Sequence, residues 1–490
     1  MLDVIVIGGG PAGVTAALRA RELGAAVALV ECDRLGGTCT NDGCVPTRVL
    51  ARAARLMRAS ENFATYGLHA QRPTLDFPSL MARTQQVVYQ VHEKKQLIKH
   101  LESSGVQVYE SVGQAHFIDP HTIALSFPAD GQDGSLKTLH AEKFILCVGG
   151  QARRLSFPGA ELALTHSDVW SLRALPRSAA IIGAAATGCQ LASIFAAFGV
   201  EVTLLDLAAR ILPAEDEDLS QAMQTAFQER GVHMLTGIAG VQHIKQDRDG
   251  LSLVYTRDGA SLQIKAETVV MAVGWPGNVS SLDLPAAEVE THGSYIVVND
   301  YLQTSAPHIF AAGDITGRMM LVQSASYQAR AAAENAVLGV GQPSRHLIVP
   351  HGGFTDPEYA SVGLTERRAR AQQECAVAVV PYADMDRAVI DGLTEGFCKL
   401  IVSVDTHRIL GAHVVGEQAV EVTQMVAAGM AADMRVEQLA ELEISYPTYT
   451  AILGLAARKI VAELGVMPLS PEWRALSRTH TAEWEWRDRG

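Results

Sequence analysis

Residues 3–31 contain the pattern that most constrains how this chain can fold. An apolar run, DVIVIG, meets the turn GGGPAG, and the segments VTAALRARELG and AAVALVE follow. Gly8, Gly10 and Gly13 form a G-x-G-x-x-G motif, whose glycines permit a tight turn, close approach of a pyrophosphate, and packing of helix on strand. Glu31 ends the second apolar run, where a carboxylate can accept hydrogen bonds from ribose hydroxyls. The pattern predicts a strand, helix and strand that bind a dinucleotide; the alternative is a glycine-rich turn that binds nothing.

A second copy of this pattern lies at residues 179–206. It predicts a strand AAIIG, a turn AAATG, a helix CQLASIFAAFG and a strand VEVTLLD. Gly183 and Gly188 hold the first and third glycine positions, whereas Ala185 occupies the second and narrows the approach for a pyrophosphate. Asp206 ends the strand without an adjacent arginine, which favours NADH, with its free 2′-hydroxyl, over NADPH. A structural repeat without a ligand is the alternative.

The stretch GGTCTNDGCVPTR, residues 36–48, places Cys39 and Cys44 close together after the first unit. The chain has seven cysteines, but in a large acidic sequence they do not suggest the disulfide framework of a small secreted protein. Because no C-x2-C or H-x3-H pair nearby completes a tetrahedral zinc set, we expect no metal site. The two cysteines are therefore a redox pair or a coincidence.

Composition restricts the partners and the location. The formal net charge of -13 and the lack of a Lys/Arg-rich run argue against nucleic acid. Asp3 stands where a secretory signal would carry positive charge, so we expect a cytoplasmic protein. The uncharged run 178–200 is long enough for a membrane span, but its glycines divide it into a strand, a turn and a helix, so we expect no membrane association.

A third segment completes a family resemblance. TSAPHIFAAGDITG, residues 304–317, predicts a short strand followed by Gly313 and Asp314, where an acid at a helix start can bind a second part of a cofactor. The chain resembles the class I pyridine nucleotide-disulfide oxidoreductases, the flavoproteins that include dihydrolipoamide dehydrogenase, glutathione reductase and mercuric reductase. The resemblance runs from residue 2 to about 465 and follows the family's order: GGGPAG, GGTCTNDGCVP, LCVGGQARRLSFPG, the second nucleotide motif, RILPAEDEDLS, AVGWPGN, FAAGDITG, FTDPEYASVGLTE and RILGAHVVG.

The resemblance implies an α/β fold with two Rossmann-like dinucleotide-binding domains, one for FAD and one for NAD, and a C-terminal α+β dimerisation domain. The FAD domain would occupy residues 1–149 and resume at 277–346, with the NAD domain at 150–276 between the two parts. Residues 347–490 would form the interface of a homodimer in which each active site is completed by the other subunit.

The resemblance also assigns site residues. Cys39 would exchange with substrate and Cys44 would face the flavin, and a helix that begins near Pro46 would place its positive end beside them. Because a thiolate must attack the disulfide, the thiol pKa must fall from its ordinary value of about 8.5. The residues implied for FAD are Gly8, Gly10, Gly13, Glu31, Gly37, Thr38, Gly149, Gly313 and Asp314. Those implied for NAD(H) are Gly183, Gly188, Asp206 and Gly274.

The chain departs from the family pattern near its C-terminus. Members that act on lipoyl or glutathione disulfides usually carry His-Pro followed by Glu, with the His as acid-base catalyst and the Glu orienting it. Here Tyr446 precedes Pro447, and Ala451 stands at the Glu position. A phenol with a pKa of about 10 is a poor base at pH 7, although it can donate a hydrogen bond.

Further departures lie beside the expected flavin. Arg48 and Gln190 stand where members have a Lys–Glu ion pair, and Ala186 stands where some have a Tyr that covers the flavin. If Arg48 points inward, its charge favours anionic reduced flavin and a thiolate at the second cysteine. The alternative is that Arg48 turns outward to a surface acid.

The sequence therefore predicts an FAD-dependent, NAD(H)-linked disulfide/dithiol oxidoreductase, with electrons passing between NAD(H), FAD, the Cys39/Cys44 pair and an external disulfide. A dihydrolipoamide-like substrate, free or carried on a protein arm, is the leading hypothesis. One alternative is a mercuric reductase-like metal-ion reductase or a quinone reductase, although no cysteine follows Cys398 to form the C-terminal Cys-Cys pair of mercuric reductases. A redox-sensing flavoprotein with little turnover is an alternative of another class.

Overall fold

The computed structural model describes residues 2–126, 137–248, 250–346 and 348–466. The C-terminal tail that contains Trp473, Trp484 and Trp486 lies outside these residues. The chain divides into two compact units: unit 1 comprises Met1–Leu212 and Phe227–Leu347, and unit 2 comprises Pro213–Ala226 and Ile348–Gly490. The finer division into four domain segments stays a prediction.

The first sheet of unit 1 carries the first dinucleotide motif. Its order is β3-β2-β1-β6-β5-β4, and β17 also pairs with β6. The strands are β1 (Leu2–Ile7), β2 (Val27–Val30), β3 (Gln107–Tyr109), β4 (Ala115–Asp119), β5 (Thr122–Leu125), β6 (Lys137–Leu146) and β17 (Ile309–Ala311). β1 runs parallel to β2 and β6, and β17 runs parallel to β6. The carboxyl ends of these strands meet at one edge, where α/β sheets bind nucleotides.

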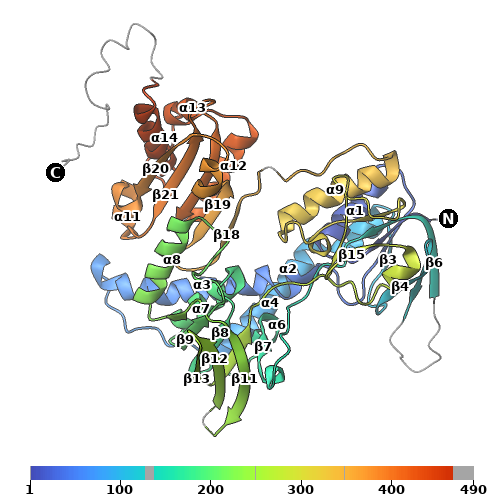
Figure 1. The fold of residues 1–490 in the computed structure, drawn as a ribbon, viewed down its shortest axis with the longest axis horizontal. Coiled ribbons are helices and arrows are strands. Elements are labelled where there is room, and N and C mark those ends of the chain that lie inside the picture. Colours follow the sequence, from blue (N-terminus) through green and yellow to red (C-terminus); the bar gives the residue numbers. More distant parts are fainter. Residues whose placement is uncertain (1, 127–136, 249, 347, 467–490) are drawn as a thin grey trace. The chain divides into compact units, whose positions relative to one another are not determined.

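Alternate residues of β1 face two separate hydrophobic cores, as a strand buried on both faces requires. Val6 packs in one core with helices α1 (Pro11–Glu22) and α9 (Val322–Leu338), and Ile5 packs in the other. The buried residues of both helices are mostly alanines, so the helices contact each other closely and lie side by side in Figure 1.

The second sheet of unit 1 repeats this arrangement. Its order is β10-β9-β8-β14-β7, and every pair is parallel. The strands are β7 (Leu164–Thr165), β8 (Ser178–Ile182), β9 (Glu201–Leu205), β10 (His233–Leu235) and β14 (Thr268–Met271). Helix α7 (Ala186–Ala197) connects β8 to β9, as α1 connects β1 to β2. An antiparallel sheet of β11 (Gly240–Asp247), β12 (Gly250–Arg257) and β13 (Ala260–Ala266) and a two-stranded ribbon of β15 (Thr291–His292) and β16 (Tyr295–Ile296) complete the strands described in unit 1.

Both predicted dinucleotide units form, with shifted helix starts. The predicted helices began after the third glycine, but α1 begins at Pro11 and α7 at Ala186. The third glycine of each motif therefore lies inside the helix. Pro11 at the first helical position explains the earlier start of α1, because proline lacks the N–H that would go unsatisfied there.

Helices fill the connection between β2 and β3. They are α2 (Gly37–Asn41), α3 (Cys44–Ala59), the 3-10 helix η1 (Ser60–Tyr66), α4 (Phe77–Lys95) and α5 (Leu97–Ser103). The helix expected near Pro46 begins at Cys44, and Cys39 lies in the separate helix α2. The Asp76 side chain caps the start of α4 by accepting from the Ser79 N–H.

Unit 2 is built on an antiparallel sheet of order β18-β19-β22-β21-β20. The strands are β18 (His351–Gly353), β19 (Tyr359–Gly363), β20 (Cys375–Pro381), β21 (Phe397–Ser403) and β22 (Ile409–Val415). Helices α10 (Glu366–Arg370) and α11 (Asp386–Asp391) lie between these strands, and α12 (Ala419–Ala431), α13 (Val436–Glu441) and α14 (Ala451–Glu463) follow the sheet. The apolar faces of α12 and α14 share one core with the sheet.

Buried charges attach residues 213–226, where helix α8 (Glu217–Glu229) begins, to the rest of unit 2. The Lys399 ammonium on β21 donates to Asp216 at 2.9 Å and to Asp218 at 2.8 Å, and it pairs with Glu366. The side chains of Lys399 and Asp216 are each only 2% exposed. Most of the motif RILPAEDEDLS thus lies in the C-terminal unit.

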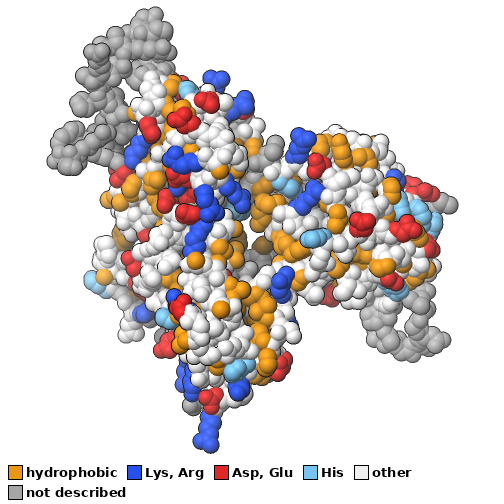
Figure 2. All heavy atoms as spheres, in the orientation of Figure 1, with side chains coloured by type: hydrophobic (Ala, Val, Ile, Leu, Met, Phe, Trp, Pro, Cys, Tyr) orange, Lys and Arg blue, Asp and Glu red, His pale blue; other side chains and the backbone are white. Residues whose placement is uncertain are grey.

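On the face drawn in Figure 2, Lys and Arg side chains alternate with Asp and Glu side chains rather than forming the basic stripe that nucleic acid needs. Among the described helices, none is long and apolar enough to cross a membrane.

Candidate active site

The first glycine-rich turn has the backbone that a dinucleotide requires. Gly8 has φ +103°, and a Cβ there would lie 2.3 Å from the Cys147 carbonyl oxygen. A Cβ on Gly13 would lie 1.7 Å from the Gly8 carbonyl oxygen. At Gly10 the nearest atom would be 3.7 Å away, so the backbone there is open to a ligand. Two glycines fix the turn and the third leaves room for a pyrophosphate, which fits FAD.

Glu31 lies where the sequence predicts, directly after β2, and is 8% exposed. Its Oε2 accepts from the Gly9 N–H at 2.6 Å, and its Oε1 accepts from the Asp33 N–H at 2.9 Å. The carboxylate is therefore held across the glycine turn, where it stands beside the expected adenosine ribose.

The second turn repeats these contacts. A Cβ on Gly183, at φ +104°, would lie 2.3 Å from the Ala272 carbonyl oxygen, and one on Gly188 would lie 1.8 Å from the Gly183 carbonyl oxygen. Asp206 accepts from the Ala184 N–H at 2.5 Å, as Glu31 accepts from Gly9. Ala185 caps the start of α7 and adds only a methyl group at the second position. This geometry fits a second dinucleotide.

The structure brings Cys39 and Cys44 together beside the first turn. Gly37, at φ +59°, begins α2, and a Cβ there would lie 2.7 Å from the Gly10 Cα, so the redox helix touches the nucleotide turn directly. Cys44 is the first residue of α3, and its thiol hydrogen bonds to Cys39. Thr38 lies between Gly37 and Cys39, and its carbonyl oxygen accepts from the Asp42 N–H at 2.9 Å.

The two thiols have different acidities. The hydrogen bond from Cys39 lowers the pKa of Cys44 to about 7, although burial opposes this effect. The same hydrogen bond, burial and the negative charge at Cys44 raise the pKa of Cys39 far above its ordinary value. The reduced pair therefore holds its negative charge at Cys44 and its proton at Cys39.

Three successive residues after Cys39 are each anchored by a different contact. Lys95 donates to the Thr40 hydroxyl at 2.8 Å, and His92 hydrogen bonds to the Asn41 side chain at 2.5 Å. The third residue, Asp42, accepts from the Ser167 hydroxyl at 2.5 Å and from the Trp170 indole at 2.7 Å. The loop between the cysteines is thus fixed by α4 on one side and by residues next to the second sheet on the other.

Asp314 begins a 3-10 helix, η4 (Asp314–Thr316), after β17. Burial raises the pKa of Asp314, and the Trp275 side chain opposes this by donating a hydrogen bond to the carboxylate. Gly313, at φ +85°, donates its N–H to Gln328 at 2.7 Å, which orients the loop. The negative charge of Asp314 also raises the pKa of both Cys39 and Cys44, so this cofactor candidate belongs to the same site.

The remaining glycines lie in loops near these groups. Gly149, at φ +64°, accepts at its carbonyl oxygen from the Asn278 N–H at 3.0 Å. Gly274, at φ +121°, accepts from the Arg153 N–H at 3.1 Å. Trp275 follows Gly274, and its ring lies 4.9 Å from the His166 ring, centroid to centroid.

Helix α3 packs against α7, so three of the positions that depart from the family pattern, Arg48, Ala186 and Gln190, lie on neighbouring helices. Gln190 donates to the Ala186 carbonyl oxygen at 3.1 Å, one turn back along α7. Arg48 lies one turn into α3 and is exposed.

Tyr446 belongs to unit 2 rather than to the unit that holds the cysteines. Its side chain is largely exposed, and its hydroxyl donates to the Asp386 carboxylate at the start of α11. Tyr449 is buried and donates to Asp391 at 2.8 Å. Ala451 begins α14, as a small residue with high helix propensity can.

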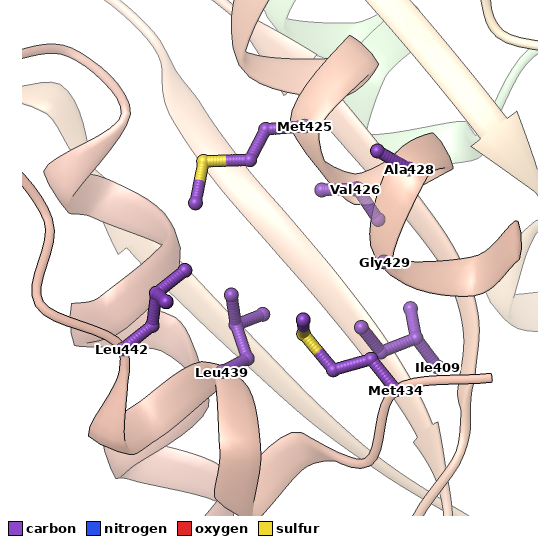
Figure 3. A pocket seen from close by; sticks show the side chains of 8 residues that line it. All are labelled: Ile409, Met425, Val426, Ala428, Gly429, Met434, Leu439 and Leu442. Atoms are coloured by element: carbon purple, nitrogen blue, oxygen red, sulfur yellow. The ribbon is translucent and has the colours of Figure 1, made fainter. Parts of the chain in front are cut away.

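An apolar pocket of about 200 Å³ lies in unit 2 between α12 and α13. Figure 3 shows Met425, Met434 and Leu439 pointing into it. The lining residues are Ile409, Met425, Val426, Ala428, Gly429, Met434, Leu439 and Leu442. They offer no titratable or nucleophilic group for redox chemistry.

Comparisons with known proteins identify the family of this chain. The family model described as pyridine nucleotide-disulphide oxidoreductase matches residues 2–329, and the one described as its dimerisation domain matches residues 349–457. The dihydrolipoyl dehydrogenase of Zymomonas mobilis is 32% identical over 459 residues, covering 91% of this chain and 95% of that protein. The mercuric reductase of Staphylococcus aureus is 32% identical over 460 residues, which cover 93% of this chain and 82% of that protein. The HOCl-induced flavoprotein disulfide reductase RclA from Escherichia coli has 27% identity and a TM-score of 0.81, covering 93% of this chain and 99% of that chain.

Two glycine-rich turns on separate sheets, with a hydrogen-bonded thiol pair against one of them, are features that a flavoprotein disulfide reductase requires. The chain belongs to the pyridine nucleotide-disulphide oxidoreductase family and is an FAD- and NAD(H)-dependent enzyme that acts on sulfur groups. Its C-terminal dimerisation domain forms a homodimer. The predicted fold class, enzyme class and cofactors are thus confirmed, whereas the individual roles of the site residues stay predictions.

Several residues with structural contacts to the predicted site residues were not predicted. Lys95 and His92 come from the last turn of α4, and Trp275 comes from the loop after β14. Within unit 2, Asp386 accepts from Tyr446 but lies 60 positions away in sequence. Trp275 lies in the quoted motif AVGWPGN, so the motif marked its position without its contact. No local pattern marks the other three residues.

Proposed function

We propose that the enzyme exchanges electrons between NAD(H) and an external dithiol or disulfide through Cys39 and Cys44, with a dihydrolipoamide-like molecule as substrate. The observation that carries this proposal is the hydrogen bond between the Cys39 and Cys44 thiols beside the first glycine-rich turn, which lowers the pKa of Cys44 and raises that of Cys39. When bound, FAD supplies the two-electron chemistry that links this pair to NAD(H).

In the direction of dithiol oxidation, one substrate thiol loses its proton and its sulfur attacks Cys39. The Cys39–Cys44 bond breaks, and Cys44 leaves as a thiolate. The second substrate sulfur then attacks the first, the substrate disulfide forms, and Cys39 leaves and takes up the second substrate proton. The substrate is oxidised by two electrons, the cysteine pair is reduced by two, and one proton remains to be accepted elsewhere.

We assign the acceptance of that proton to Tyr446 and Asp386 of the partner subunit in the homodimer. The tyrosine oxygen takes the thiol proton while its own proton passes to the Asp386 carboxylate, so the tyrosine stays neutral throughout. This relay supplies the base that the missing His would provide. It is supported by the hydrogen bond from the Tyr446 hydroxyl to Asp386.

A second candidate is reduction of a soft metal ion, or of a quinone, without a His base. It is favoured by tyrosine at the His position, by the relatives described as mercuric reductases, and by a Cu(II) complex of the structural neighbour RclA. Among the described residues, no three His, Cys, Asp or Glu side chains gather to hold a metal ion. A metal substrate would therefore react at the two thiols. For either function, we propose a cytoplasmic location.

The deciding experiment is anaerobic rapid mixing of the oxidised holoenzyme with dihydrolipoamide, with NADH as control, while the long-wavelength thiolate-to-flavin charge-transfer absorbance is followed. We expect both reagents to raise the band, and Tyr446→Phe and Asp386→Asn to slow only the dihydrolipoamide reaction, by roughly 10²-fold. A band raised by NADH alone would favour the second candidate. No band with either reagent would refute the roles of both cysteines.

A further inference from the structure

The last turn of α4 holds the redox helix α2 through two side chains. His92 hydrogen bonds to Asn41, and Lys95 donates to the Thr40 hydroxyl at 2.8 Å. Both partners lie on the five-residue helix that carries Cys39. These contacts join residues more than 50 positions apart in sequence, so they fix where α2 lies within unit 1.

Thr40 makes this contact specific. It is fully buried, it directly follows Cys39, and it lies between the two cysteines. Its hydroxyl therefore holds the Lys95 ammonium beside the loop, although the rest of the lysine is exposed. An otherwise mobile lysine is thus confined to one place next to the dithiol.

The charges around the cysteine pair oppose one another. Asp314 raises the pKa of both thiols, whereas Lys95 lowers the pKa of both. Burial, followed by the charges of Arg34 and Lys95, lowers the pKa of His92, which favours its neutral ring. In the last turn of α4, Lys95 therefore brings positive charge to the pair and His92 brings a neutral hydrogen-bonding group.

We propose that Lys95 is a positioning residue of the redox pair, whose ammonium, fixed on Thr40, keeps a positive charge beside the dithiol and favours the reactive thiolate. This inference rests on the proposed dithiol chemistry at Cys39 and Cys44. A fixed cation also stabilises the reduced form relative to the disulfide, so Lys95 makes the pair a stronger oxidant of external dithiols.

The test measures the rate of iodoacetamide alkylation of the NADH-reduced holoenzyme against pH, with the modified cysteine identified by mass spectrometry. Lys95→Met should raise the apparent pKa of the dithiol by about half a unit to one unit, a modest effect because the lysine is at the surface. At pH 7 this slows alkylation by roughly two- to fivefold, because the thiolate fraction falls from about one half. The shift should shrink in 1 M salt.

Three further variants separate charge from structure. Lys95→Gln keeps a donor for Thr40 without the charge and should behave like Lys95→Met. Lys95→Arg keeps the charge and should restore most of the wild-type profile. Lys94→Met removes the adjacent exposed lysine of the same turn and should leave the profile unchanged. Flavin content and circular dichroism verify that each variant is folded.

The outcomes separate this inference from the proposed function. If NADH does not make Cys39 and Cys44 alkylatable in the wild-type enzyme, the proposed function fails. If they become alkylatable but Lys95→Met and Lys95→Gln retain the wild-type profile, only the role of Lys95 is refuted. A Lys95→Gln profile like wild type beside a shifted Lys95→Met would show that the hydrogen bond acts without the charge, which also overturns the proposal.

Discussion

Lys399→Met tests whether buried charges hold residues 213–226 in unit 2. The Lys399 ammonium bonds to Asp216, Asp218 and Glu366. Burial alone would lower the pKa of Lys399, but these carboxylates outweigh it and raise that pKa above its ordinary value. Methionine has a similar length and flexibility, so the substitution removes the charge while leaving little empty space.

The expected loss of stability comes mainly from Asp216. Removing one partner of a buried ion pair costs about 3–5 kcal/mol. Asp218 and Glu366 are 58% and 27% exposed, so water can solvate them in the variant, whereas Asp216 is 2% exposed. Asp216 still accepts from the Glu366 N–H at 2.9 Å. We therefore expect a loss of about 3 kcal/mol at pH 7, at the lower end of that range.

The loss should depend on pH. Burial raises the pKa of Asp216, but hydrogen bonds from the Glu366 N–H and Lys399 and the charge of His413 hold it below its ordinary value. A carboxylate with a lowered folded-state pKa contributes stability above its unfolded pKa, about 4, and loses it as the pH falls through the folded value. The difference between wild type and Lys399→Met should therefore narrow below about pH 4.

Urea unfolding of the holoenzyme, followed by circular dichroism at fixed protein concentration, measures this loss. The double variant Lys399→Met/Asp216→Asn also removes the buried negative charge that Lys399 balanced, so it should recover at least half of the lost stability. A loss below about 1 kcal/mol at pH 7, or a double variant no more stable than Lys399→Met, would refute the reasoning.

Two further predictions compare the equivalent glycines of the two turns and test the pH dependence of stability at Asp42. Gly13→Ala places a methyl group 1.7 Å from the Gly8 carbonyl oxygen and should abolish flavin binding, whereas Gly188→Ala places one 1.8 Å from the Gly183 carbonyl oxygen and should weaken only NADH binding. Flavin absorbance and NADH titration measure the two effects. A Gly13→Ala protein that keeps its flavin would contradict the assignment. Burial raises the pKa of Asp42 despite its hydrogen bond from Ser167, so its carboxylate form is disfavoured in the fold. Asp42→Asn should therefore leave the free energy of unfolding unchanged or raise it by up to about 1 kcal/mol at pH 7, and this gain should vanish as the pH falls through the raised pKa of Asp42. Thermal unfolding across pH measures the gain. A large loss of stability at pH 7 would refute the prediction.

Both dinucleotide turns could be predicted because their requirements are local. Gly8 and Gly183 need positive φ, and Gly13 and Gly188 need the absence of a Cβ, conditions that only glycine meets without strain. The helix starts were predicted a few residues late because the last residues of each glycine-rich motif also form the first turn of the helix. The attachment of residues 213–226 to unit 2 could not be predicted, since it depends on Lys399, more than 180 positions away.

The loop between Cys39 and Cys44 shows that a sequence motif can identify the reacting sulfur atoms without identifying the groups that set their pKa. The family motif predicts Cys39 and Cys44 as the redox pair, but two thiols at this spacing do not by themselves determine which one holds the charge. That depends on the hydrogen bond between them, whereas Lys95 and Asp314, which come from other parts of unit 1, shift the pKa of both thiols in the same direction. The loop residues between the cysteines bind α4 on one side and Ser167 and Trp170 on the other. A change in any of these distant partners can therefore alter the chemistry of an unchanged motif.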